Sequence, residues 1–320
     1  MSQKLKHLLD IKSLTKDQFL SLLESAKSFI EVGDRDVKKV PALRGKTVMN
    51  IFYESSTRTR VSFELAAKRL SADAINISSS GSSTDKGETL LDTVRNIQAM
   101  GPELVVIRHK DSGSPHMLSK MVQNVGFINA GDGTHEHPSQ GLLDCLTLSE
   151  YFEKKGTTFS GKKIAIVGDI MHSRVARSNI WANILLGNHV TLVAPPTLMP
   201  YEAKAAFGDK VEVTHSISGI KDADIVMVLR MQLERMSSFF VPNLEEYCNL
   251  FCLTEDRLKQ YAPDAVVMHP GPMNRGIEIS TEVADGPRSV ILRQVTLGVA
   301  SRMAILYNLC LGAAGNISEV

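Results

Sequence analysis

The sequence predicts an α/β protein of two doubly wound domains, each with a parallel sheet and with the active site in the cleft between them. Strand-like apolar segments alternate with helix-like segments along the chain. Its 320 residues make about two domains of usual size. A polar, glycine-containing stretch, residues 154–163, separates two such series. We expect domains at residues 1–153 and 154–292, with a last helix, about 293–312, packing on the first domain.

The first element is a helix. Thr15 and Gln18 have the spacing of a capping box, and apolar residues follow at helical intervals from Phe19 to Ile30. Gly33 is placed to end this helix.

Two series of strands and helices follow. In the first, strands are expected at residues 47–53, 74–77 and 104–108, and helices at 61–70, 88–100, 114–124 and 140–152. In the second, strands are expected at 163–167, 190–193, 211–214, 224–229 and 265–268, and helices at 175–186, 199–207 and 295–311.

Composition excludes several classes of protein. With 43% hydrophobic and 22% charged residues, the chain is neither disordered nor collagen-like. Its net charge of +1 lacks the basic excess of a nucleic-acid binder. The four cysteines form no C-x-x-C pair, so we expect reduced thiols in a cytoplasmic protein. No apolar run is long enough to predict a membrane span or a signal peptide.

Ligands of open parallel sheets bind at the carboxyl ends of strands, so the residues after each strand are the candidates for a site. The segment from Glu54 to Arg60 follows the first strand and offers hydroxyls, two arginines and the N-terminus of a helix. This combination predicts an anion-binding cup, although a plain helix cap with solvated arginines is the common alternative. Arg108 ends a neighbouring strand, and the serine-rich loop at 78–88 could bring Lys86 to a bound anion.

His135 and His137 stand in the most polar turn of the first half. They could be two metal ligands, but no further histidine or cysteine cluster supplies a third and fourth, so we expect no metal. We favour His137 as a hydrogen-bond donor to a substrate carbonyl.

In the second half, arginines follow two strands, at Arg174 and Arg177 and again at Arg230 and Arg235. Solvated surface charge is the ordinary interpretation of each, but together they suit a substrate with two carboxylates. A rigid turn of two prolines and two glycines, residues 269–276, follows the last predicted strand and could present backbone carbonyls. No G-x-G-x-x-G fingerprint supports dinucleotide binding.

Two motifs resemble those of the aspartate and ornithine carbamoyltransferase family. The segment 52–64 (FYESSTRTRVSFE) resembles its carbamoyl-phosphate motif, and His137-Pro138-x-Gln140 its second signature. The stretches 230–235 and 269–272 are similar to those of the aspartate-specific members. The resemblance implies transfer of the carbamoyl group from carbamoyl phosphate to the amine of L-aspartate, in pyrimidine biosynthesis.

The resemblance also implies the site. Phosphate would be held by Ser56, Thr57, Arg58, Thr59 and Arg108, and the carbamoyl group by Thr59, His137 and Gln140. Aspartate would be bound by Arg174, Arg230, Gln232 and the turn of Pro270, Gly271 and Pro272, with Glu54 pairing with Arg174 or Arg235. Ser82 (or its neighbour Ser83) and Lys86 would enter from the adjacent subunit of a homotrimer.

The catalytic set is then Arg58, Thr59, Lys86, Arg108 and His137, with no cofactor and no metal. Dihydroorotase or regulatory chains as partners are left open. Two other classes of function also stay open: a metal-dependent amidohydrolase using His135 and His137, and a non-catalytic anion-binding protein on the same fold. Ornithine as acceptor is disfavoured because arginines at two strand ends would repel a cationic side chain.

Overall fold

The computed structural model describes residues 5–78, 88–232 and 243–314, and the chain divides into two compact units. Unit 1 comprises Met1–Leu146 with Thr296–Val320, and unit 2 comprises Thr147–Val295. Both boundaries fall inside long helices, α5 (Pro138–Lys154) and α11 (Ile291–Ala314). Each unit contains one entirely parallel sheet, as the alternation of strands and helices predicts.

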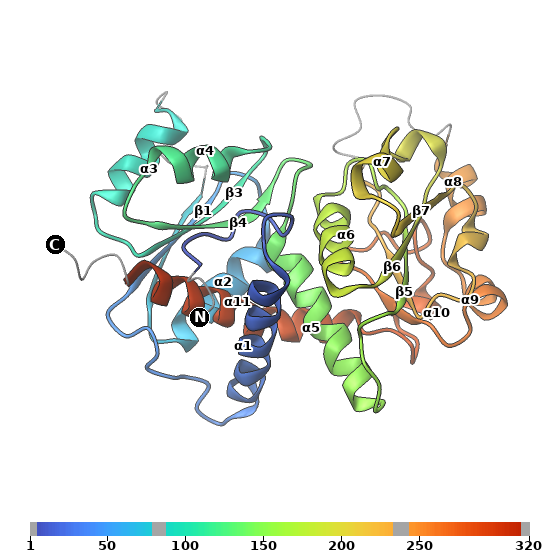
Figure 1. The fold of residues 1–320 in the computed structure, drawn as a ribbon, viewed down its shortest axis with the longest axis horizontal. Helices are drawn as coiled ribbons and strands as arrows, with labels where there is room; N and C mark the ends of the chain where they lie inside the picture. The colour runs from blue at the N-terminus through green and yellow to red at the C-terminus, as the bar shows by residue number, and fades with distance from the viewer. Residues whose placement is uncertain (1–4, 79–87, 233–242, 315–320) are drawn as a thin grey trace. The chain divides into compact units, whose positions relative to one another are not determined.

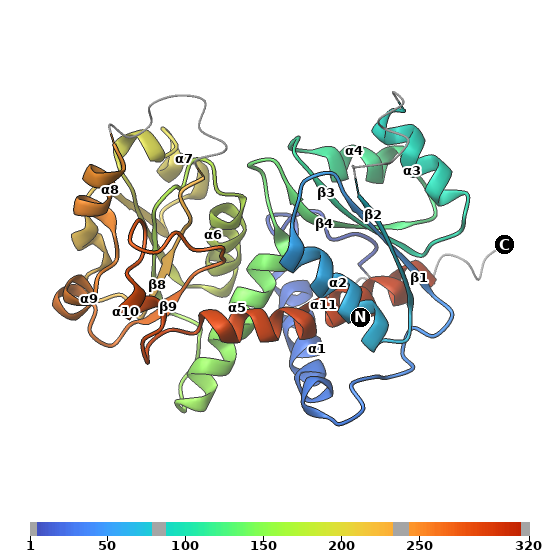
Figure 2. The same cartoon turned by 180° about the vertical axis from the view of Figure 1, so that it is seen from behind.

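Unit 1 contains a four-stranded sheet in the order β2-β1-β3-β4. The strands are β1 (Thr47–Phe52), β2 (Asp73–Ser78), β3 (Leu104–His109) and β4 (Gly126–Asp132). The accompanying helices are α1 (Lys16–Asp34), α2 (Thr57–Arg69), α3 (Leu90–Gln98) and α4 (Ser114–Met121). Helices α3 and α4 cover one face of the sheet, and α2 lies on the other (Figures 1 and 2).

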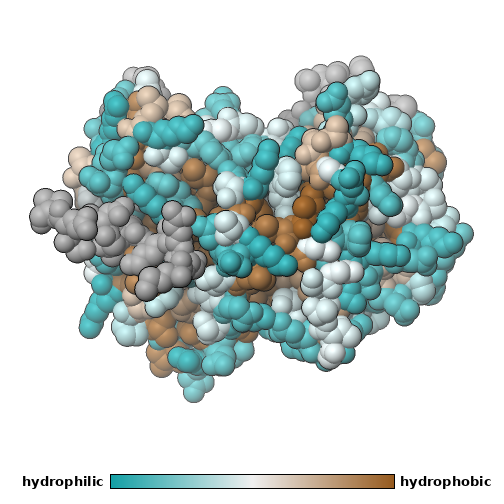
Figure 3. Space-filling model, viewed as in Figure 1, coloured by the Kyte–Doolittle hydropathy of each residue, from teal (hydrophilic) through white to brown (hydrophobic). Residues whose placement is uncertain are grey.

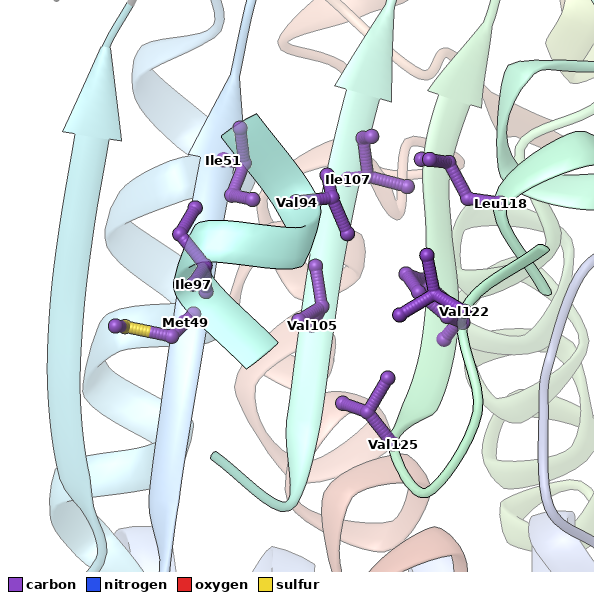
Figure 4. Close-up of a cluster of buried hydrophobic side chains, with 10 residues drawn as sticks. Met49, Ile51, Val94, Ile97, Val105, Ile107, Leu118, Val122 and Val125 are labelled. Atoms are coloured by element: carbon purple, nitrogen blue, oxygen red, sulfur yellow. The ribbon is translucent and has the colours of Figure 1, made fainter. Parts of the chain in front are cut away.

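A cluster of buried apolar side chains packs α3 and α4 against one face of the sheet in unit 1. Figure 4 shows Met49 and Ile51 of β1 and Val105 and Ile107 of β3 meeting Val94 of α3. All are less than 5% exposed. Burying one such side chain contributes about 1.5–3 kcal/mol, so this cluster stabilises the packing of the helices on the sheet.

Unit 2 contains a five-stranded sheet in the order β7-β6-β5-β8-β9. The strands are β5 (Lys163–Val167), β6 (His189–Val193), β7 (Val211–Thr214), β8 (Ile225–Val228) and β9 (Val266–Met268). The helices are α6 (Arg174–Leu186), α7 (Ala203–Phe207), α8 (Leu244–Phe251), α9 (Glu255–Tyr261) and α10 (Thr281–Ala284), with 3₁₀ turns at Pro196–Leu198 and Ile217–Ile220. Helix α6 lies on one side of the sheet, and α8 and α9 lie on the other (Figures 1 and 2).

Several expected boundaries are corrected. Helix α1 does not end at Gly33: that residue lies inside the helix, and the cap, Arg35, has ordinary extended backbone with φ −73°. Helix α2 begins at Thr57 rather than at residue 61, because the Ser56 hydroxyl caps it. The helix expected at 199–207 is only α7, starting at Ala203. Strand β4 and helices α8 to α10 were not anticipated.

The surface has the mixed character of the composition. In the face drawn in Figure 3, hydrophilic side chains alternate with small apolar patches over each unit. Within the described ranges, no helix combines the length and apolar character required to cross a bilayer.

Candidate functional site

Each sheet has one switch point, where the strand order reverses. In unit 1 it lies between β1 and β3, since β2 follows on one side and β4 on the other. In unit 2 it lies between β5 and β8. Connections leave the sheet in opposite directions at such a point, which opens a crevice at the carboxyl ends of the two strands. Residues 53–60 and Arg108 adjoin the first switch point, and residues 168–174 and 229–232 adjoin the second.

The helix after β1 begins where the predicted cup lies. Ser56 is the N-cap of α2, and its hydroxyl accepts a hydrogen bond from the Thr59 amide at 3.4 Å. Thr57, Arg58 and Thr59 therefore form the first turn, which contains no acidic residue. The positive end of the helix dipole at this turn favours an anion. Arg58 is exposed and Thr59 is 6% exposed, so the cup combines a solvent-accessible guanidinium with a buried threonine.

Arg108 ends β3 beside this turn. Its register partner on β1 is Phe52. Its guanidinium donates through Nη1 to the Ala130 carbonyl at 3.2 Å and through Nη2 to Glu54 Oε1 at 2.6 Å. A planar fork held at two points in this way keeps a fixed orientation.

Glu54 thus has a partner in its own unit. The ion pair with Arg108 joins residues 54 positions apart across the strand ends. Pairing of Glu54 with Arg174 or Arg235, expected from the resemblance, stays a prediction.

The N-terminus of α5 carries the second motif of unit 1. His137 directly precedes Pro138, the first residue of the helix, and its carbonyl accepts from the amides of Gln140 at 2.9 Å and Gly141 at 3.2 Å. The His137 ring Nδ1 lies 3.4 Å from the Ser139 hydroxyl. His137 is 4% and Gln140 9% exposed, so the turn has little freedom to move.

A buried polar network behind this turn was missed by the sequence analysis. The Gln140 amide donates to Asp144 Oδ1 at 2.9 Å. Arg302 of α11 is 3% exposed, and its guanidinium interacts electrostatically with both Asp144 and Arg58. Burial lowers the pKa of Arg302 to about 10, while Asp144 opposes that shift. An arginine in the apolar stretch 295–311 was the available signal.

In unit 2, the turn after β5 is tightly built. Gly168 has φ +121°, and a Cβ there would lie 3.0 Å from the Leu229 carbonyl, so the ends of β5 and β8 approach closely only with glycine. Asp169 Oδ1 accepts from the His172 amide at 3.1 Å and contacts its Nδ1 at 2.9 Å. The Ser173 hydroxyl then caps α6, accepting from the Ala176 amide at 3.1 Å.

The candidate aspartate-binding arginines differ in exposure. Arg174, the first residue of α6, is 3% exposed, so it is not a solvated surface charge. Arg177 donates to the Met171 carbonyl at 3.0 Å, which makes it part of the turn itself. Arg230 and Gln232 follow β8 and are half-buried.

The turn after β9 is held from within. The Gly271 amide donates to His269 Nδ1 at 2.8 Å, and His269 Nε2 lies 3.3 Å from Glu278 Oε1, both side chains being fully buried. The peptide bond between Gly271 and Pro272 is cis. Pro270 and Gly271 are half-buried and Pro272 is exposed, which places the turn at the surface of unit 2.

Some predicted site residues lie outside the described part of the chain. Ser82, Ser83 and Lys86 fall in residues 79–87, and Glu234 and Arg235 fall in residues 233–242. Their roles stay predictions.

His135 lies in a group of possible metal ligands that the sequence does not indicate. A histidine from α4, His116, joins His135 and Asp132: one possible ligand atom from each lies within 4.8 Å of the others. His137 is not a member of this group. Residue spacing could not indicate it, because His116 is 19 positions from His135.

Two domain families of known proteins match this chain, one over each half. The carbamoyl-P binding domain of aspartate/ornithine carbamoyltransferases matches residues 6–150, and the Asp/Orn binding domain of that family matches residues 160–309. The chain is 54% identical over 318 residues to the aspartate carbamoyltransferase catalytic subunit of Magnetococcus marinus, covering 98% of this chain and 96% of that protein. It is 53% identical to the corresponding subunit of Pelobacter propionicus, covering 97% and 98%.

Solved structures of aspartate and ornithine carbamoyltransferases also match the fold of this chain. Aspartate transcarbamoylase from Trypanosoma cruzi, in complex with N-(phosphonacetyl)-L-aspartic acid, superposes with a TM-score of 0.85 at 28% identity, covering 96% of this chain and 97% of that one. Ornithine carbamoyltransferase from Pyrococcus furiosus superposes with a TM-score of 0.82 at 30% identity, with the same coverage. On its sequence and on its two parallel-sheet units, this chain belongs to the aspartate/ornithine carbamoyltransferase family.

Proposed function

We propose that the chain transfers the carbamoyl group of carbamoyl phosphate to the amine of L-aspartate, giving N-carbamoyl-L-aspartate and phosphate. The observation that carries this proposal is the presence of cationic groups beside both switch points: Arg58 and Arg108 in unit 1, and Arg174 and Arg230 in unit 2. Two anionic substrates repel each other, and a chain of net charge +1 can hold both only by concentrating its arginines in this way.

The relatives of the chain support aspartate as the acceptor. The proteins from Magnetococcus marinus and Pelobacter propionicus are aspartate carbamoyltransferase catalytic subunits, and each is more than half identical to this chain. The Trypanosoma cruzi enzyme has been crystallised with carbamoyl phosphate and aspartate together. Arginines in unit 2 would repel the cationic side chain of ornithine.

We assign the substrates to the two parts of the chain. Residues 1–153, with the last helix, would bind carbamoyl phosphate, and residues 154–292 would bind aspartate. Ser56, Thr57, Arg58 and Thr59 would hold the phosphate at the N-terminus of α2, whose dipole favours an anion. Arg174, Arg230 and Gln232 would bind the two carboxylates, and the turn of Pro270, Gly271 and Pro272 would orient the amine.

The reaction forms one bond and breaks one. The amine nitrogen attacks the carbonyl carbon of carbamoyl phosphate, and a tetrahedral oxyanion develops on the carbamoyl oxygen. Collapse of this intermediate breaks the bond between carbon and the phosphate oxygen. The leaving phosphate accepts the proton lost by the amine, so the step needs no carboxylate base.

Three donors would stabilise the oxyanion: the ring of His137, the guanidinium of Arg108 and the hydroxyl of Thr59. All three side chains are largely buried, which strengthens a hydrogen bond to a developing charge. Loss of one donor of this kind costs about 2.7–4 kcal/mol of transition-state stabilisation. Holding both reactants in place further removes the entropy of bringing them together.

The site would be completed by a second copy of the chain. Ser82 and Lys86 would enter from the adjacent subunit of a homotrimer, and the enzyme would act in the cytoplasm in pyrimidine biosynthesis. The four cysteines, Cys145, Cys248, Cys252 and Cys310, form no disulfide, which suits a reducing compartment.

The test is a direct assay. Purified chain is incubated with carbamoyl phosphate and L-aspartate, and both phosphate and N-carbamoyl-L-aspartate are quantified, with ornithine and no acceptor as parallel reactions. Formation of phosphate and N-carbamoyl-L-aspartate in equal amounts, only in the reaction that contains aspartate, supports the proposal. Phosphate release at the same rate with and without an acceptor, or carbamoylation of ornithine, contradicts it.

A pair of variants ties the activity to the cup. Arg58→Ala should lower turnover by about 100-fold or more, since it removes a cation that faces the phosphate. Lys68→Ala, which removes an exposed cation from the last turn of the same helix, is the control and should retain most activity. Near-normal turnover of Arg58→Ala would remove Arg58 from the phosphate site.

A further inference from the structure

Unit 1 holds a second polar cluster, distinct from the residues assigned to the substrates. It gathers Asp10 of the N-terminal segment, His116 of α4, Asp132 at the end of β4 and His135 of the following turn. These residues come from three separate stretches of sequence, so only the fold brings them together. The two imidazoles and the Asp132 carboxylate form a donor set suited to a transition metal.

The spacing of the donors fits a single ion. One ring nitrogen each of His116 and His135, and one carboxylate oxygen of Asp132, lie within 4.8 Å of one another. The two rings are 5.3 Å apart between centroids, at an interplanar angle of 75°. Ligand atoms around a tetrahedral Zn²⁺ are about 3.4 Å apart, so modest side-chain rotations would close the site.

His116 is already oriented as metal-binding histidines are. Its Nε2 lies 2.6 Å from Asp10 Oδ2, and Asp10 Oδ1 accepts in turn from the Ser13 amide at 2.6 Å. A carboxylate on one ring nitrogen fixes the proton there and leaves the electron pair on the other. That other nitrogen, Nδ1, is buried and has no hydrogen-bond partner among the described residues.

Asp132 is fixed in place before any ion binds. It is fully buried, and its carboxylate accepts from the Gly113 amide at 2.7 Å and from Asn129 Nδ2 at 2.7 Å. Its Oδ2 also lies 3.1 Å from Nδ1 of His135, so a carboxylate oxygen already stands beside one of the two imidazoles. The negative charge of this carboxylate attracts a divalent cation.

We propose that His116, Asp132 and His135 bind a first-row divalent transition metal, with Zn²⁺ as the best match, and that Asp10 orients His116 from behind. Three protein ligands leave a fourth position for water. The ion would tie the N-terminal segment and α4 to the turn after β4. This site is independent of carbamoyl transfer, and its test does not use that activity.

The test measures metal binding directly. The full chain is stripped with a chelator, dialysed, and titrated with Zn²⁺ in competition with a chromophoric chelator. We expect one ion per chain. His116→Gln and His135→Gln should each weaken binding by more than about 100-fold, and Asp10→Asn by about 10–100-fold with the stoichiometry kept.

A matched control separates this site from ordinary histidine–aspartate pairs. His172 contacts Asp169 with the same three-residue spacing as His135 and Asp132, at 2.9 Å, but belongs to no group of three possible ligands among the described residues. His172→Gln should bind Zn²⁺ as tightly as the wild type. Cys248→Ser should do so too, which excludes binding through the half-buried Cys248 thiol.

Unchanged affinity in folded His116→Gln and His135→Gln would overturn the proposal, as would loss of binding in His172→Gln alone. If the ligand variants do not fold, the wild-type chain with ¹⁵N-labelled histidine decides. In its NMR spectrum, one equivalent of Zn²⁺ must then change the ¹⁵N chemical shifts of the ring nitrogens of two histidines only. A shift at all histidines, or at none, also overturns it.

Discussion

The side-chain amide of Gln140 donates a hydrogen bond to Asp144, one turn further along α5, at 2.9 Å. Asp144 is fully buried and interacts electrostatically with Arg302, whose guanidinium is buried in α11. Helices α5 and α11, far apart in sequence, are thus linked in unit 1 by one carboxylate. The residue proposed to hold the carbamoyl group depends for its orientation on charges that do not touch substrate.

Asp144→Ala should therefore lower the free energy of unfolding by about 3 kcal/mol, because it removes the acceptor of the Gln140 amide and the carboxylate that offsets the buried charge of Arg302. Asp144→Asn keeps an oxygen for Gln140 and should lose about half as much. Urea denaturation measures both. Adding Arg302→Met to Asp144→Ala should restore part of the loss. A double variant less stable than Asp144→Ala would contradict the coupling.

Arg108 gives a second prediction, on activity. Its fork spans the Ala130 carbonyl and Glu54, and lysine has no planar pair of donors with which to do so. Arg108→Lys should lower kcat by about 10²–10³-fold, as loss of an oxyanion donor does. Steady-state kinetics with carbamoyl phosphate test it, with Arg95→Lys on the exposed side of α3 as control. Equal kcat values for the two variants would place Arg108 outside the chemistry.

Strand ends could be predicted from the sequence because apolar runs and the polar residues after them are local signals. The prediction that Arg108 stands near the segment after β1 is confirmed by the ion pair with Glu54. Strand β4 was missed because residues 126–132 include two glycines and end in aspartate, although every residue of the strand is buried. The strand forms through pairing with β3 and through burial, which are tertiary contacts that local propensity does not show.

Side-chain networks could not be predicted, since they join distant stretches through packing. The Gln140, Asp144 and Arg302 network links residues 140 and 302. His116 reaches His135 only because α4 packs beside β4. Residue type alone predicts a helix end at Gly33, yet α1 ends after Asp34 without a left-handed residue.

The pH dependence of stability follows from His7. Its Nδ1 accepts a hydrogen bond from the Phe127 amide at 3.0 Å, which requires the neutral ring. Burial, assisted by Lys6, lowers the pKa of His7 to about 4 from 6.5. Between pH 6.5 and pH 4 the unfolded chain therefore binds more protons than the folded chain. The contribution of His7 to the free energy of unfolding is fully present above pH 6.5 and is lost as the pH falls toward 4.

We expect His7 to account for about 1–2 kcal/mol of the loss in unfolding free energy between pH 7 and pH 4, after allowance for its partial exposure to solvent. His7→Asn keeps a hydrogen-bond acceptor but cannot be protonated. Urea denaturation at the two pH values should show a smaller difference for this variant. An identical difference would show that other groups cause the acid sensitivity.

Sharing of the site between subunits is tested by mixing two inactive variants. Lys86→Ala lacks the residue proposed to come from the neighbour, and His137→Ala lacks one from the chain itself. In a randomly reassembled trimer, about a quarter of the sites combine an intact His137 with an intact Lys86 from the adjacent chain. Mixing after dissociation should therefore recover about a quarter of wild-type turnover, whereas each variant reassembled alone stays inactive. A self-contained site recovers nothing, because every chain in the mixture then carries one defect in its own site.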